Sequence, residues 1–252
     1  DCAKLAGVDL DLEQIIRDTI SGGASGDDLS NLIELAIKKE IPFNFQALFR
    51  ETLKGGQQDK IKAFIKTAKK LHIDLGDLPA AFREMADYDL FERDGASAIF
   101  SLAEIAEQEG IVVNFGFQRP EVATAVQKFI ERIAGKNMGV LGRIFYIDNI
   151  ADQAAQRGIS LDFSNPIFAE RCAAEVEGFL VIPRNIFDHG EGWAEQQKNA
   201  RKIFSFAKKR NIQFNAVKPL RNLLERFSTK SPAWTQSIIN FAKEMRVNLD
   251  ET

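Results

Sequence analysis

The sequence predicts an all-α fold, an α-solenoid of about six stacked helical hairpins of unequal length. Three observations support this prediction: a ten-residue motif recurs seven times, successive copies are 32 to 53 residues apart, and apolar residues flank the copies at helical spacing. Periods of this size with two helices per repeat are typical of solenoids, in which each hairpin stacks on its neighbours. We therefore expect a single helical-repeat domain over residues 1–252.

The recurring motif, called the joint below, is Ala, four residues, Ile or Val, one residue, an apolar residue, then Asn, Asp or Gly, and one further residue. The clearest copy is AAQRGISLDF at 154–163, and the seven copies begin at Ala3, Ala36, Ala68, Ala106, Ala154, Ala207 and Ala242. The fourth residue after the Ala is Gly or Asn in four copies, and both residues tolerate the left-handed conformation that ends a helix. The Asn or Asp offers an oxygen to the free amides of a following helix. Each joint therefore predicts a helix end, a short extended link and a new helix.

Apolar residues on both sides of the joints have the spacing of amphipathic helices. An apolar residue lies four positions before the Ala at Leu32, Phe64, Leu102, Ile150, Ile203 and Ile238. After three joints the apolar residues follow an i, i+3, i+4 stripe, at Leu12/Ile15/Ile16, Phe45/Leu48/Phe49 and Leu78/Ala81/Phe82. One apolar stripe on each helix must be buried against a neighbour. The joints therefore connect helices that require packing partners.

Taken in order, the chain alternates predicted helices and turns. We expect helices over about 11–20, 29–39, 119–134 and 140–156. We expect turns within hairpins at 21–28, 55–58 and 94–97. The least regular segment, 178–193, lies in the longest interval and is interpreted as an insertion, which in repeat proteins is often part of the binding face.

Both ends of the sequence look like parts of further repeats. Residues 1–6 resemble the tail of a helix, and residues 249–252 stand where another helix would be capped. Because solenoids normally end in polar capping repeats, we expect the chain to be a piece of a longer array. The period and the helix–turn–helix unit are similar to those of tetratricopeptide and ankyrin arrays, but the signature residues of both families are absent. We therefore predict the architecture without a family.

Composition indicates a globular chain in a reducing compartment. The 252 residues are 45% hydrophobic and include 20 Phe, enough for a large core. No apolar run approaches eighteen residues and no signal peptide is visible, so we expect a cytoplasmic protein without a transmembrane segment, although the missing initial Met leaves a removed leader open. Two cysteines are too few for a disulfide framework or a zinc site. Of these, Cys172 is interpreted as a buried apolar residue.

Positive charge is concentrated in the C-terminal part of the chain. Residues 1–190 carry 21 Lys and Arg against 30 Asp and Glu, whereas residues 191–246 carry 12 against 4. The candidate face for an anionic partner consists of Lys198, Arg201, Lys202, Lys208, Lys209, Arg210, Lys218 and Arg221. Such a face would attract an acidic protein or an anionic membrane. Alternatively, these cations form the solvated backs of two helices, with some complementing a helix C-terminus.

Nucleic acid is a less favoured partner for the basic region. Its aromatic residues include Phe204 and Phe214, but these occupy core positions of the repeat. The isoelectric point near 5.6 is also far below that of dedicated nucleic-acid binders.

A second candidate binding surface is the polar cluster in the irregular segment. It contains Arg184, Asp188, His189, Glu191 and Trp193. A His beside two carboxylates could serve as a general base or metal ligand, but no second His or Cys pair accompanies it. The pattern therefore favours an exposed loop, and we predict no catalytic residue, no metal and no cofactor.

The sequence is most consistent with a non-catalytic scaffold that binds another protein, because solenoids expose extended surfaces. The alternative is the scaffold or recognition portion of a larger enzyme or translocated effector. RNA or anionic-membrane binding by the basic C-terminal third is a third interpretation.

Overall fold

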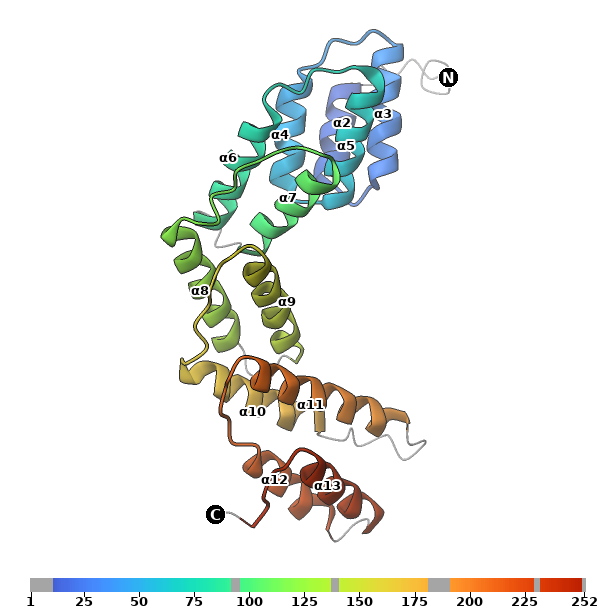
Figure 1. The fold of residues 1–252 in the computed structure, drawn as a ribbon. Helices are drawn as coiled ribbons and strands as arrows, with labels where there is room; N and C mark the ends of the chain where they lie inside the picture. The colour runs from blue at the N-terminus through green and yellow to red at the C-terminus, as the bar shows by residue number, and fades with distance from the viewer. Residues whose placement is uncertain (1–10, 92–95, 137–140, 181–190, 229–231, 251–252) are drawn as a thin grey trace. The chain divides into compact units, whose positions relative to one another are not determined.

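The structure is a computed structural model, and it describes residues 11–91, 96–136, 141–180, 191–228 and 232–250. Within these residues the chain forms twelve helices and no strand, and the helices follow one another as six hairpins (Figure 1). The pairs are α2 (Leu12–Ser21) with α3 (Gly26–Lys38), α4 (Phe45–Gly55) with α5 (Gln58–Leu71), α6 (Leu78–Phe91) with α7 (Ala96–Gln108), α8 (Pro120–Gly135) with α9 (Arg143–Gln156), α10 (Pro166–Leu180) with α11 (Glu191–Lys209), and α12 (Val217–Phe227) with α13 (Pro232–Glu244). The predicted all-helical fold is confirmed.

The six hairpins group into two compact units. The N-terminal unit, Asp1–Phe117, contains the first three hairpins, and the C-terminal unit, Gln118–Thr252, contains the last three. In the N-terminal unit α2 packs on α4 and α4 on α6, while α3 packs on α5 and α5 on α7. Each hairpin therefore stacks on the next one through equivalent helices, a packing consistent with a solenoid.

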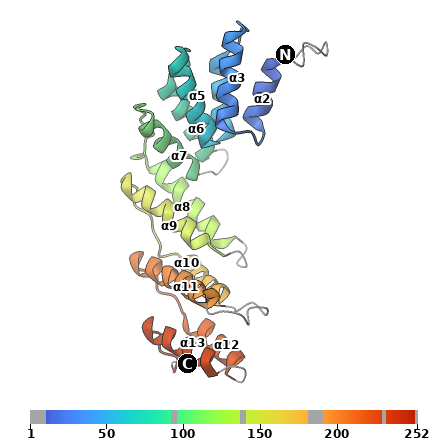
Figure 2. The same ribbon diagram turned by 90° about the vertical axis from the view of Figure 1, so that its right-hand side faces the viewer.

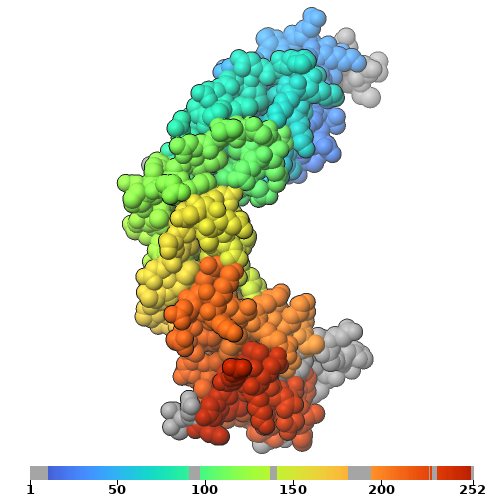
Figure 3. Space-filling view, viewed as in Figure 1, coloured from blue at the N-terminus to red at the C-terminus, as the bar shows by residue number. Residues whose placement is uncertain are grey.

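The C-terminal unit is built in the same way. Helix α10 packs on both α8 and α12, and α11 packs on α9. The two helices of each hairpin lie side by side in Figure 2, and Figure 3 shows the atoms of α12 and α13, in red, against the orange atoms of the preceding hairpin. Aromatic contacts continue this stack, since the rings of Phe204 in α11 and Phe241 in α13 are 6.2 Å apart.

The six described joints all end their helices in the same hydrogen-bonded turn. The fourth residue after the Ala has a positive φ in every case, at Glu40, His72, Gly110, Gly158, Asn211 and Arg246. The amide of the next residue, Ile or Val, donates to the carbonyl of the joint's Ala at 2.8 to 3.1 Å. This is the Schellman arrangement. The predicted helix end is confirmed, and the six Ala residues are at most 3% exposed.

Starts of the following helices agree with the prediction at two joints and differ at others. The side chains of Asp11 and Asn44 each accept from the amide three residues later, at 3.0 Å, and cap α2 and α4 as expected. At Asn114 and Asp162 the side chain instead accepts from the amide two residues later, and the helix begins further along, at a proline. Proline suits the first position of a helix. Helix α8 begins at Pro120, in agreement with the helix expected from about 119, and α10 begins at Pro166 and not directly after Asp162.

Helix α3 begins at Gly26, three residues before the expected start. The Ser25 hydroxyl accepts from the amide of Asp28 at 3.2 Å, and the Asp28 carboxylate accepts from the amide of Ser25 at 2.9 Å. This reciprocal capping box lengthens the helix into the predicted loop. Hydrogen bonding to Ser25 also lowers the pKa of Asp28 below its ordinary value. Gly26 is required at this place, because an added Cβ would lie 2.7 Å from the Asp59 carbonyl oxygen.

A buried lysine of α5 closes the first hairpin. Lys60 is 1% exposed, and its Nζ donates to the carbonyl oxygens of Thr19, Ile20 and Gly22 at 2.6, 3.1 and 2.7 Å. These carbonyls are at the C-terminal end of α2, where helical partners are missing and the dipole is negative. All three ammonium protons are therefore used in capping a helix.

An ion pair on α10 closes the α8–α9 hairpin in a related way. Arg171 and Glu175 are both fully buried, with Nε and Oε1 3.9 Å apart. Arg171 donates to the Ala134 carbonyl at the C-terminal end of α8, at 2.9 Å, while Glu175 accepts from the Ile144 amide at the start of α9, at 3.1 Å. Burial lowers the pKa of Arg171 and raises that of Glu175. Cys172 lies between them on the helix and is buried, as predicted, with a thiol pKa that burial raises to about 12.

Candidate interaction groove

The structure separates the predicted basic face into cations paired within the protein and cations that line a groove. Lys209 Nζ lies 2.6 Å from Asp152 Oδ1 and 3.2 Å from Asp148 Oδ1, on α9. Arg210 contacts the same two carboxylates, at 3.0 Å for Asp148. The hydrogen bond between Lys209 and Asp152 lowers the pKa of the aspartate and raises that of the lysine. These two cations connect neighbouring hairpins.

Other cations of the predicted face also have partners inside the C-terminal unit. Arg201 makes a two-pronged contact with Glu244 of α13, at 2.7 and 2.9 Å, and this raises the pKa of the arginine and lowers that of the glutamate. Lys198 pairs with Glu195 at 3.1 Å within α11. Lys202 Nζ lies 5.4 Å from the centre of the Phe145 ring, a cation–π distance.

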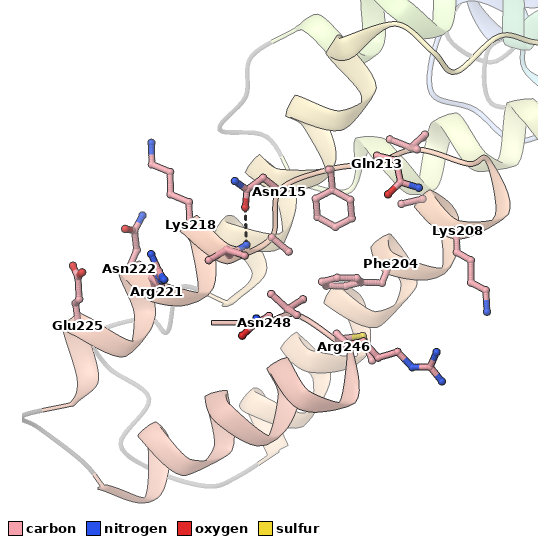
Figure 4. A pocket seen from close by; sticks show the side chains of 17 residues that line it. Phe204, Lys208, Gln213, Asn215, Lys218, Arg221, Asn222, Glu225, Arg246 and Asn248 are labelled. Carbon is pink, nitrogen blue, oxygen red and sulfur yellow. Dashed lines mark hydrogen bonds between the residues drawn. The ribbon is translucent and has the colours of Figure 1, made fainter. Parts of the chain in front are cut away.

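The remaining three predicted cations line a cavity of about 840 Å³, called the C-terminal groove below. Lys208 lies at the end of α11, and Lys218 and Arg221 lie on α12 (Figure 4). The lining also includes Arg246, from the last joint. Arg221 donates to the Leu249 carbonyl through Nε and Nη2, at 2.9 and 2.7 Å. The groove therefore brings together side chains from α11, α12 and two successive joints.

Aromatic and amide groups form the centre of this groove. The rings of Phe204 and Phe214 are 5.1 Å apart, and both residues line the groove. The amide side chains of Gln213, Asn215 and Asn248 also line it, and Asn215 Oδ1 accepts from the Val217 amide at 2.9 Å. Lys208 and Arg246 lie on one side of the Phe204 ring and Lys218 on the other (Figure 4).

A second groove occupies the equivalent position of the repeat in the N-terminal unit. This N-terminal groove, of about 610 Å³, is lined by residues 37, 43–46 and 71–74. Counted from the Ala of each joint, these positions match residues 208, 214–217 and 245–248, all of which line the C-terminal groove. The two units thus carry a groove made by the same positions of two successive joints.

In the link of each joint, exposed and buried side chains alternate. The sixth residue after the Ala is exposed in all six described joints, at Pro42, Asp74, Val112, Ser160, Gln213 and Asn248. The residues before and after it are half-buried or buried in every case. Extended backbone points successive side chains in opposite directions, so the link presents one side chain outward and holds its neighbours in the core.

The predicted polar cluster cannot be placed as a site. Arg184, Asp188 and His189 lie outside the described residues. Glu191 and Trp193 belong to α11, but their side chains are outside the described part as well. In the part of the chain that the structure does describe, no group of three or more His, Cys, Asp or Glu side chains is arranged to hold a metal ion.

Sequence reasoning missed Arg246 as a groove residue. Arg246 ends the helix of the last joint, where it adopts the left-handed conformation with φ 57°. The available signal was its place in the joint, since His72 at the same position lines the N-terminal groove. Because the turn fixes the backbone at this position, the residue there lies at the groove.

Comparisons with known proteins do not identify a family for this chain. No protein-family model matches the chain, and no curated protein matches it either. Among the described helices, none combines the length and apolar character that crossing a membrane requires.

Proposed function

We propose that this chain is a non-catalytic helical-repeat module that binds a segment of another protein in the grooves between successive joints. The observation that carries the proposal is the recurrence of a groove at the same joint positions in both units. A cavity formed by chance packing is not expected to recur at the same positions of the repeat. A binding surface built from the repeat is expected to recur there, as in other solenoids.

The chemistry of the grooves suits an extended polypeptide. Extended peptides are recognised by groups that pair with their backbone and by pockets for alternate side chains. The C-terminal groove supplies the amide of Gln213 together with the rings of Phe204 and Phe214. Amide groups both donate and accept hydrogen bonds, so they can pair with a peptide backbone in either direction.

Site-specific photo-crosslinking tests the proposal. A photoreactive amino acid replaces Gln213, which is exposed in the groove, and in a matched protein it replaces Gln236, which is exposed on α13 outside the groove. We expect a discrete crosslinked protein from the natural host extract at Gln213 only, with the attachment mapped to one segment by mass spectrometry. Equal yields at the two positions, or attachment scattered over many segments, would refute the proposal.

A further inference from the structure

The C-terminal groove carries an excess of positive charge. Its lining contains the cations Lys208, Lys218, Arg221 and Arg246, and the single carboxylate Glu225. Among the described residues, Lys208, Lys218 and Arg246 form no ion pair with a carboxylate. Arg221 donates to the Leu249 carbonyl and likewise forms no ion pair with a carboxylate in the described part of the chain. The positive potential of the groove is therefore available to a ligand.

Several other cations of the basic region are paired with carboxylates. Lys209 and Arg210 share Asp148 and Asp152 on α9, and Arg201 is held by Glu244 on α13. These three cations connect neighbouring hairpins, whereas Lys208, Lys218, Arg221 and Arg246 line the C-terminal groove.

The equivalent N-terminal groove lacks this charge. Ile37 stands at the position of Lys208, His72 at that of Arg246, and Asp74 at that of Asn248. The repeat therefore sets the shape of both grooves, while the side chains at these positions make only the C-terminal groove cationic. The two grooves differ in charge, and charge is a common basis for choosing between partners.

The aromatic rings of the groove favour a protein ligand over nucleic acid. Phe204 and Phe214 contact one another at 5.1 Å, and Phe204 also packs edge-on against Phe241 of α13. Both side chains are half-buried and contact other rings, so they offer an apolar patch between the cations and less ring surface than a base-stacking platform provides. An apolar side chain flanked by carboxylates fits this arrangement.

We propose that the occupant of the C-terminal groove is an extended acidic segment of a partner protein, with an apolar residue over Phe204 and Phe214 and carboxylates toward Lys208, Arg246 and Lys218. This inference rests on the proposed function and adds the chemical class of the partner. The amide of Gln213 pairs with the backbone of the segment, and the cations select its charge.

Peptide selection on the intact chain tests this inference. Random peptides of about twelve residues, long enough to span about 40 Å when extended, are displayed on phage and selected on the wild-type protein. The same selection is made on the groove variant Lys208→Glu/Lys218→Glu and on the control Lys128→Glu/Lys243→Glu. Lys243 occupies the same joint position as Lys208, and both control residues are exposed outside the groove, so net charge changes equally.

We expect the wild type and the control to enrich peptides with several Asp or Glu around one apolar residue. The groove variant should bind these peptides about tenfold or more weakly, and raising the salt concentration should weaken wild-type binding. Enriched peptides without acidic residues, or equal binding by groove and control variants, would overturn the inference. So would tighter binding of an oligouridine of equal length, or of vesicles containing phosphatidylserine.

Failure of the inference can be told apart from failure of the proposed function. Each selected peptide is also crosslinked to the protein with the photoreactive residue at Gln213. If non-acidic peptides attach at Gln213, the groove binds polypeptide and only the acidic preference is wrong. If no peptide is selected or none attaches there, both proposals are wrong.

Discussion

Replacing Gly110 by Ala should destabilise the N-terminal unit by about 1 kcal/mol, the usual cost of a left-handed non-glycine residue. Gly110 ends α7 with φ 69°, and an added Cβ would meet no atom within 4 Å. No steric clash contributes, so the expected loss is the backbone term alone. Gly23→Ala is the matched control, because its added Cβ also meets no atom within 4 Å while its φ is outside the left-handed region. The control should be neutral or stabilising by about 0.5 kcal/mol, since Ala restricts the unfolded chain.

Urea denaturation followed by circular dichroism measures both variants, and hydrogen exchange with mass spectrometry locates the change in α6 and α7. For a unit of this size, 1 kcal/mol corresponds to about 4 °C in the thermal midpoint. The reverse substitution Glu40→Gly, at the same joint position with φ 55°, should stabilise the unit by up to about 1 kcal/mol. If Gly110→Ala is no less stable than Gly23→Ala, the left-handed helix end does not determine the energetics of the joint.

Three further outcomes follow from buried or paired ionisable groups. Lys60→Met leaves three carbonyls at the end of α2 without their donor and should cost about 2 to 4 kcal/mol, whereas Lys66→Met, exposed on the same helix, should change stability by less than about 0.5 kcal/mol. Denaturant titration distinguishes the two variants, and equal effects would contradict a capping role for Lys60. Asp152 has a lowered pKa in the folded state, so its contribution is present above its ordinary value of 3.8 and is lost as the pH falls through the folded value. Asp152→Asn should therefore flatten the loss of stability below about pH 4, and an unchanged acid-unfolding curve would argue against the pairing with Lys209. Cys172, with its thiol pKa raised to about 12, should resist iodoacetamide at about pH 8 until denaturant is added, and mass spectrometry of its peptide would reveal any earlier alkylation.

The candidate groove could be predicted from the sequence only in part. Lys208, Lys218 and Arg221 were recognised as members of a basic region, but so were Lys209 and Arg210, which adjoin Lys208 in the chain. Their difference depends on Asp148, which is 61 residues away from Lys209 in sequence and 3.2 Å away in the fold. The number of charged residues in a sequence does not show which of them are paired with a residue of opposite charge.

Buried charges illustrate the same limit. Nothing in the spacing of Lys60 distinguishes it from Lys62 or Lys66 on the same helix, yet Lys60 alone of the three is buried and caps α2. Arg171 and Glu175 similarly look like an ordinary i, i+4 surface pair, whereas both are fully buried and close the α8–α9 hairpin. A charged residue can be buried when neighbouring helix ends supply its partners, and those neighbours are set by packing.

By itself, the sequence determined the helical hairpins and the joints between them. These features depend on hydrogen bonds and apolar contacts within about ten residues of chain, so a repeated local pattern is sufficient to specify them. Even Glu40, His72 and Arg246, which are unusual in the left-handed conformation, follow the pattern because the turn's hydrogen bonds and the buried Ala hold them there. The tertiary structure decided which charges are neutralised and where two joints enclose a groove. Those outcomes require residues far apart in sequence to meet, and only the packing of successive hairpins brings them together.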